Sequence, residues 1–139
     1  MNLTSKEILI QAKDETVYEL LSNCNNFKQY IPEIQNWQST ENTCRFTIQG
    51  VGDVEMFIAE KKAFSTVIFE LKNQQISSII IHFDIKNQNE HSQLIAHSSI
   101  EIPFFVAQMI KSSVQKFLDL LVERIQQSIE TKHMNQTGS

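Results

Sequence analysis

The sequence predicts an α+β fold in which a curved antiparallel sheet of seven strands wraps around a long C-terminal helix. Two observations support this prediction. Apolar residues recur at three- and four-residue steps over residues 103–132, whereas they alternate with a period of two over most of residues 34–102. A helix of about 30 residues is roughly 45 Å long, so its apolar side needs a broad covering surface. The strands that precede it supply that surface.

The chain begins with a predicted strand and two short helices. Residues 7–12 alternate between polar and apolar side chains, as a strand does. Asp14 is a suitable N-cap for the first helix, whose apolar positions recur at i, i+3, i+4 and i+7. Residues 27–31 add one more apolar turn, and Pro32 ends it. Both helices therefore lie between the first strand and the rest of the sheet.

Six further strands are predicted from period-two alternation with turn residues between them. Because the links are short, consecutive strands should pair as antiparallel hairpins. The strands are expected near residues 34–40, 43–49, 52–61, 65–72, 76–86 and 92–102. Counting from the turn centres gives an inward apolar row of directly opposed residues, Met56, Phe69, Ile79 and Ala96. A second inward row beside it contains Ile58, Val67, Ile81 and Leu94.

The long helix is predicted to begin at Pro103. Proline ends the preceding strand and suits the first turn of a helix, where its missing N–H is no loss. We expect Phe117 to be buried at the centre of the contact between this helix and the sheet. Residues 1–132 are expected to form one domain, and residues 133–139 a disordered tail.

Composition and charge narrow the class of protein. The formal net charge is −4, and the acidic and basic residues are interspersed, which argues against nucleic acid or an anionic membrane as the partner. The first residues lack the apolar core of a signal peptide, and no run approaches a membrane span. We therefore expect a soluble, cytoplasmic protein without integral membrane association. Cys24 and Cys44 lack CxxC spacing and are expected to be free thiols.

The sequence offers little that resembles a catalytic or metal site. His82 and His97 are out of phase with the inward residues of their strands, and no paired Cys/His spacing occurs. We therefore expect no metal and no cofactor. Asp53 and Glu55 alternate with inward apolar residues and should point outward, so no catalytic residue is assigned. Gly50-Val51-Gly52 lacks the third glycine of a phosphate-binding loop and is predicted to be a hairpin turn.

This order of elements resembles the helix-grip fold of the START/Bet v 1-like (SRPBCC) superfamily. Residues 13–21 look like the first helix of its polyketide cyclase/dehydrase-like branch, and residues 25–32 resemble the second helix with its proline. The resemblance covers about residues 3–130 and implies a cavity for an apolar or amphipathic ligand. The superfamily includes lipid-transfer proteins, plant hormone receptors, aromatic cyclases, quinone-binding proteins and chaperone co-factors, so the fold leaves the function open.

Within that range, we expect non-catalytic binding or transport of a small hydrophobic or amphipathic ligand between the sheet and the C-terminal helix. A few hydroxyls in an apolar lining suit orientation of a ligand better than bond making. One alternative is an aromatase/cyclase-type enzyme, which would need more inward polar groups. Another is a ligand-free protein-interaction module of the chaperone co-factor type, with a core filled by its own side chains. The predicted lining residues are Phe27, Tyr30, Phe46, Met56, Phe69, Phe83, Ser98, Met109, Ile110, Ser113 and Phe117.

The opposite face of the sheet also has a predicted apolar row. The same register places one apolar residue from each of four neighbouring strands side by side on this outward face, namely Phe57, Ile68, Ile80 and Ile95. A contiguous row of this kind predicts a homodimer with a two-fold axis. The alternative is packing within a monomer, beneath the long side chains of Lys61, Glu70 and Gln93.

Overall fold

The computed structural model describes residues 1–31, 33–48, 52–74 and 78–137, with side chains to Thr131. The expected helix end at Pro32 and the turn residues Gly50 and Val51 lie outside these ranges. In chain order the elements are β1 (Asn2–Thr4), β2 (Ile8–Ile10), α1 (Asp14–Leu21), the 3₁₀ helix η1 (Cys24–Gln29), β3 (Ile34–Ser39), β4 (Thr43–Ile48), β5 (Gly52–Lys62), β6 (Thr66–Asn73), β7 (Ile79–Gln88), β8 (His91–Ile100) and α2 (Phe104–Thr137).

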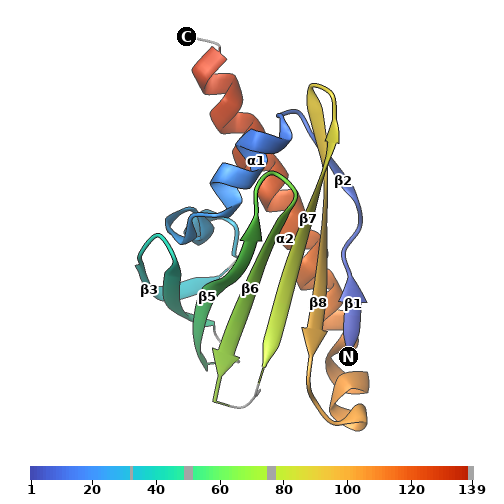
Figure 1. Cartoon of the computed structure of the whole chain (residues 1–139). Coiled ribbons are helices and arrows are strands. Elements are labelled where there is room, and N and C mark those ends of the chain that lie inside the picture. Colours follow the sequence, from blue (N-terminus) through green and yellow to red (C-terminus); the bar gives the residue numbers. More distant parts are fainter. Residues whose placement is uncertain (32, 49–51, 75–77, 138–139) are drawn as a thin grey trace.

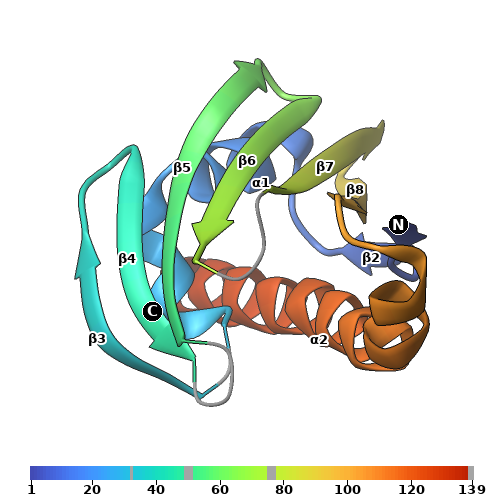
Figure 2. The same ribbon diagram turned by 90° about the horizontal axis from the view of Figure 1, so that it is seen from below.

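The described strands join one curved antiparallel sheet in the order β1-β8-β7-β6-β5-β4-β3, and α2 packs on its concave side against the β1–β2–β8 edge (Figures 1 and 2). β2 also pairs with β8, so β1 and β2 together form one interrupted edge strand. Ser5 stands at the interruption, where its Oγ accepts a hydrogen bond of 2.9 Å from the Ala96 N–H. The predicted α+β helix-grip fold, with two short helices after the first (here interrupted) strand, is confirmed.

The predicted faces of the strands are correct, but the predicted register is not. The predicted pairs slip by two or four residues, except beyond the bulge after Ile58, and such even slips keep each side chain on its face. Met56 lies opposite Leu71 rather than Phe69. The two observed inward rows are Cys44–Met56–Leu71–Ile79–Ile100 and Ile58–Phe69–Ile81–Ser98–Leu3.

The turns explain the slip. The β7–β8 turn is formed by Asn89 and Glu90, and Asn89 has a φ of 64°. The β5–β6 turn contains Phe64 at a φ of 65°, a left-handed conformation that is uncommon for a bulky residue. The Phe64 ring packs edge-on against Tyr18, with 5.6 Å between ring centroids. The conformations of these two turns determine how the flanking strands align.

The predicted outward apolar row, on which the homodimer prediction was based, does not form. In the observed register Phe57 lies opposite Glu70, Ile68 opposite His82, and Ile95 opposite Asp84. Ile80 lies between Glu70 and Ser99. Each of these four apolar side chains therefore has a polar neighbour directly across the ladder. The observation that supported a dimer through this face is removed.

The long helix α2 is longer than predicted and presents a different side to the core. It continues to Thr137, so residues 133–137 are helical where a disordered tail was expected. Phe117, expected at the centre of the contact, is only half-buried, whereas Leu118 is 1% exposed. The cause is position, because α2 lies against β1, β2 and β8 at one edge of the sheet. Its buried residues are Ala107, Leu118, Leu121, Val122, Ile125 and Ile129.

Polar side chains of α2 bond to the backbone of the β1–β2 edge. Gln115 Nε2 donates to the Thr4 carbonyl at 2.8 Å, and Gln126 Nε2 donates to the Leu9 carbonyl at 2.7 Å. In the other direction, Asp119 Oδ1 accepts from the Lys6 N–H at 2.8 Å. Glu130 Oε2 accepts a hydrogen bond of 3.0 Å from the Gln11 N–H, and Glu123 forms an ion pair with Lys6. We call these polar residues of α2 the polar stripe. The helix thus satisfies backbone groups that an exposed edge strand would offer to another chain.

The two short helices cover the end of the sheet's concave face that lies away from the start of α2 (Figure 1). α1 buries Val17 and Leu21, and η1 buries Phe27. The side chain of Asn23 caps η1 by accepting a hydrogen bond of 3.0 Å from the Asn25 N–H. Among the described residues, no helix has the length and apolar character needed to cross a bilayer.

Candidate functional site

Four of the predicted lining residues fill the interior themselves. Phe27, Tyr30, Phe69 and Phe83 are each at most 2% exposed. The Phe27 ring lies 4.8 Å from the Phe69 ring and 5.0 Å from the Tyr30 ring, both in edge-to-face contact. Phe69 meets Phe83 at 5.9 Å. This aromatic cluster close-packs the part of the interior that lies beneath η1.

Tyr30 anchors η1 to α2. Burial raises the pKa of its phenol to about 12, and hydrogen bonds with Ser128 of α2 and with Gln29 oppose that shift. The hydroxyl is therefore already engaged. Tyr30 does not offer a free polar group to a ligand.

Phe46 and Met56 lie nearer the β3 edge, and both are 3% exposed. Trp37 stacks on Phe46 with 5.6 Å between ring centroids. Met56 lies directly across the β4–β5 ladder from Cys44. These contacts place two more predicted lining residues in the packed core.

The two cysteines are neighbours, which the sequence did not indicate. Cys24 of η1 and Cys44 of β4 are both buried free thiols, and their side chains share a hydrogen bond. The bond from Cys44 lowers the pKa of Cys24, and the same bond, together with burial, raises the pKa of Cys44. Their spacing of twenty residues gave no signal because the contact arises from the packing of η1 on β4.

Ser98 is the predicted lining residue with an unsatisfied polar group. It is 4% exposed, and its Oγ has no hydrogen-bond partner among the described residues. By contrast, the Oγ of Ser92, also buried on β8, donates to the Ala12 carbonyl at 2.7 Å. An unsatisfied buried hydroxyl costs about 1–3 kcal/mol, so it calls for an explanation. Its cross-strand neighbours are Ile81 of β7 and Leu3 of β1, both apolar and buried.

The predicted lining residues on α2 point largely away from the interior. Met109 is 79% exposed and Ser113 is also exposed, whereas Ile110 and Phe117 are half-buried. The prediction assumed that α2 crosses the middle of the sheet. Because the helix lies along the β1–β2–β8 edge, its core-facing side is rotated toward Leu118 and Val122.

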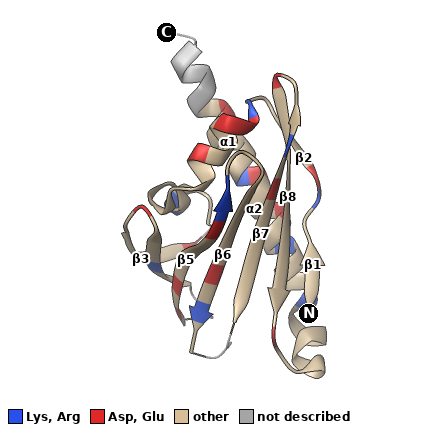
Figure 3. Ribbon diagram, viewed as in Figure 1, with Lys and Arg blue, Asp and Glu red and all other residues tan. Residues whose placement is uncertain are grey.

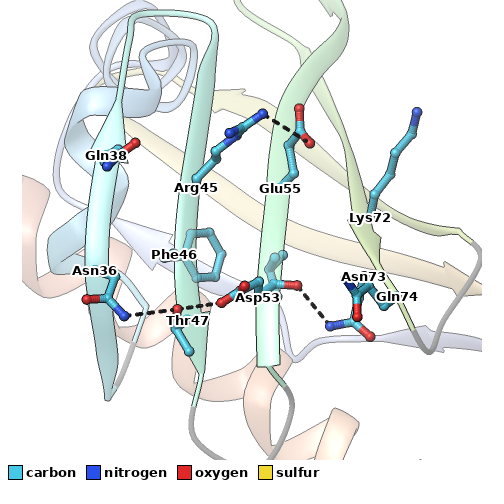
Figure 4. A pocket seen from close by; sticks show the side chains of 11 residues that line it. Asn36, Gln38, Arg45, Phe46, Thr47, Asp53, Glu55, Lys72, Asn73 and Gln74 are labelled. Carbon is cyan, nitrogen blue, oxygen red and sulfur yellow. Dashed lines mark hydrogen bonds and ion pairs between the residues drawn. The ribbon is translucent and has the colours of Figure 1, made fainter.

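A polar groove of about 620 Å³ lies on the outer face of β3–β6 (Figure 4). Thr47 Oγ1 donates to Asp53 Oδ1 at 2.8 Å, and Arg45 pairs with Glu55 at 3.8 Å. Asp53 and Glu55 thus point outward, as predicted. The groove mixes both signs of charge, and these side chains bond to one another, so it favours no one class of ligand. Its lining residues are Asn36, Gln38, Arg45, Phe46, Thr47, Asp53, Val54, Glu55, Lys72, Asn73 and Gln74.

A second groove, of about 690 Å³, lies between η1 and the outer side of α2. It too is polar, and both grooves lie outside the space between the concave face and α2. Its lining residues are Gln29, Leu120, Glu123, Arg124, Gln127, Ser128 and Thr131.

The strand histidines lie on the outer face, as predicted. Asp84 bridges them, with His82 Nε2 at 2.8 Å from one carboxylate oxygen and His97 Nε2 at 3.1 Å from the other. The His97 Nδ1 contacts Thr4 Oγ1 at 3.1 Å. Within the part of the chain that the structure describes, no group of three or more acidic, His or Cys side chains is arranged to hold a metal ion.

Comparison with solved structures confirms the helix-grip fold. A START superfamily protein from Mycobacterium smegmatis matches with a TM-score of 0.71 at 14% identity, over 94% of this chain and 97% of that one. A conserved protein from Geobacillus kaustophilus matches with a TM-score of 0.75 at 16% identity, over 94% and 96% of the two chains.

The Aha1 protein of Colwellia psychrerythraea, solved as a dimer, matches with a TM-score of 0.63 at 16% identity, over 94% of this chain and 96% of that one. No protein-family model matches the chain, and no curated protein matches it. At these identities the likeness establishes the fold alone.

Proposed function

We propose that this protein binds a small hydrophobic or amphipathic ligand on the concave face of the sheet, around Ser98. The unsatisfied Oγ of Ser98 is the observation that carries the proposal. It offers one hydrogen bond inside an otherwise apolar surface, which is the usual composition of a site for such ligands. We call this surface the Ser98 site, and it comprises Leu3, Ile81, Ala96, Ser98 and Ile100.

The adjoining part of α2 supplies the movable wall of the Ser98 site. The bond from Gln115 to the Thr4 carbonyl locates this part of the helix beside β1. Here Val114 and Phe117 are half-buried and pack against the core. A ligand that enters the Ser98 site displaces these two side chains, whereas the aromatic cluster beneath η1 stays in place.

The side chains support binding rather than catalysis. An aromatase/cyclase-type site needs several polar groups that converge on the substrate. Of the predicted lining residues, Ser98 and Tyr30 are the buried ones with hydroxyls, and the Tyr30 hydroxyl is bonded to Ser128. One hydroxyl can orient a ligand but supplies no acid–base pair.

Native mass spectrometry of protein purified from its own host, followed by lipid extraction, tests the proposal. We expect a co-purifying apolar molecule. Calorimetric titration with oleate then tests the site, because Ser98→Ala should weaken binding about three- to tenfold through loss of one hydrogen bond. Ser92→Ala is the matched control and should leave the affinity for oleate unchanged. An empty protein that also fails to bind oleate and other apolar probes would contradict the proposal.

A ligand-free protein-interaction module is the second candidate. It is favoured by the packed aromatic cluster and by the apolar side chains of Phe104, Phe105 and Met109, which are 70–79% exposed. The two candidate functions differ in whether an apolar molecule binds at the Ser98 site. A binder shifts its thermal stability when an apolar probe is added, whereas an interaction module does not.

A further inference from the structure

The first turns of α2 expose a cluster of large apolar side chains. Phe104 is 78% exposed, Phe105 is 70% exposed and Met109 is 79% exposed. We call these three residues the α2 tip. Single exposed apolar residues are common, but three large ones within six residues mark an interaction surface. Figure 1 shows that α2 begins beyond the end of the sheet, so the α2 tip lies at one end of the molecule.

The first charged residues along α2 itself are basic. Residues 102–118 contain Lys111 and Lys116, both exposed, and no Asp or Glu. Figure 3 shows the first turns of α2 without charged residues. The next carboxylates along the helix are Asp119 and Glu123, and both bond to Lys6. The net charge of −4 is therefore not representative of this end, although Glu101 precedes it.

We propose that the α2 tip inserts into the interfacial layer of an anionic lipid membrane, with Lys111 and Lys116 at the headgroup phosphates. Apolar side chains that project from the end of a helix, followed by lysines about two and three turns after Phe104 and Phe105, match the way interfacial helices bind bilayers. A protein partner would need a pocket shaped for each projecting side chain. A lipid surface needs none.

This inference rests on the proposed function and adds the source of the ligand. Ser98 precedes the first residue of α2 by six positions, and Ile100, in the Ser98 site, pairs with Ile79 at the same end of the sheet. Docking through the α2 tip therefore places the Ser98 site beside the bilayer. An apolar ligand then passes between membrane and protein without crossing bulk water.

Co-sedimentation of the full chain with vesicles tests the docking. We expect binding to vesicles of phosphatidylcholine mixed with phosphatidylglycerol, and weaker binding to phosphatidylcholine alone. Replacing Phe104, Phe105 and Met109 together by Gln should lower partitioning by about tenfold or more, because their apolar area no longer enters the lipid. The exposed Leu120 provides the matched control, since Leu120→Gln changes the same helix outside the α2 tip.

The lysines are tested separately. Lys111→Gln and Lys116→Gln should each weaken binding to the anionic vesicles about fivefold, whereas Arg124→Gln, further along α2, should not. The proposal would be overturned if the wild-type protein does not bind anionic vesicles. It would also be overturned if the variant with Gln at all three positions of the α2 tip binds them as strongly as the wild type. Light scattering that shows a dimer in the wild type and a monomer in the tip variant would also overturn it, because a second copy then covers the tip.

The docking and the proposed function fail independently. The tip variant should still bind oleate supplied in solution, because the Ser98 site is unchanged. Ser98→Ala should still sediment with vesicles. If the protein docks on vesicles but binds no apolar probe, the docking proposal stands and the proposed ligand site is wrong. If it binds an apolar probe but does not dock on vesicles, the ligand site stands and the docking proposal is wrong.

Discussion

Two serines on β8 differ in whether their hydroxyls are bonded, and this difference should appear in stability. Ser92→Ala removes the donor to the Ala12 carbonyl and should cost about 1–3 kcal/mol of unfolding free energy. Ser98→Ala removes a hydroxyl without a partner among the described residues and should cost about 0 kcal/mol or stabilise the fold. Urea denaturation measures both. Equal losses would show that Ser98 is bonded in solution.

The neighbouring residues Phe117 and Leu118 test which side of α2 meets the core. Leu118→Ala should cost about 2–5 kcal/mol, because its side chain is 1% exposed and would leave a cavity. Phe117→Ala should cost less, since Phe117 is half-buried. Thermal or urea unfolding of both variants measures the difference. A larger loss of stability for Phe117→Ala than for Leu118→Ala would show that Phe117 faces the core, as the sequence predicted.

Tyr30 should make the fold sensitive to high pH. Its pKa is raised by burial to about 12 in the folded chain, against 10.0 for an ordinary tyrosine. The stabilisation that depends on the neutral phenol is complete below pH 10 and is lost as the pH rises through about 12, a loss of about 3 kcal/mol. Unfolding followed across this range should show a steeper decline for the wild type than for Tyr30→Phe. Parallel curves would exclude this role for Tyr30.

At the scale of elements, the polar stripe of α2 should protect the β1–β2 edge. Asp119→Ala removes the acceptor of the Lys6 N–H, so the Lys6 amide should exchange with solvent faster. Hydrogen exchange followed by NMR measures this. Gln127→Ala, an exposed position on the same helix, is the control and should leave the Lys6 amide unchanged. Equal rates in wild type and Asp119→Ala would mean that the edge is protected by its pairing with β8 alone.

The sequence could predict which elements form and which face of each strand is buried, because alternation survives a slip of two residues. It could not predict the register, because this depends on left-handed backbone at Phe64 and Asn89 and on a bulge after Ile58. None of these leaves a clear trace in composition. The candidate site shows the same limit. The sheet side of the predicted lining is inside, whereas Met109 is exposed because α2 lies along an edge of the sheet.

For the whole molecule, the observed register predicts that the outer face does not join two copies. Ile80, the most exposed member of the predicted row at 39%, lies between Glu70 and Ser99. Ile80→Lys should therefore leave the oligomeric state unchanged, as measured by light scattering at micromolar concentration. Conversion of a dimer into a monomer by this substitution would restore the outer-face interface.

The stacking of Trp37 on Phe46 has an optical consequence. Trp37 is the chain's one tryptophan, and its Nε1 donates to Ser39 Oγ, which in turn bonds to Asn25 of η1. Its emission therefore senses the β3–β4 edge and the seating of η1. The strand that carries Ser98 is five strand spacings from β3, about 24 Å along the sheet. Intrinsic fluorescence should therefore change when η1 loosens, but should not respond to ligand binding near Ser98 at the opposite edge of the sheet.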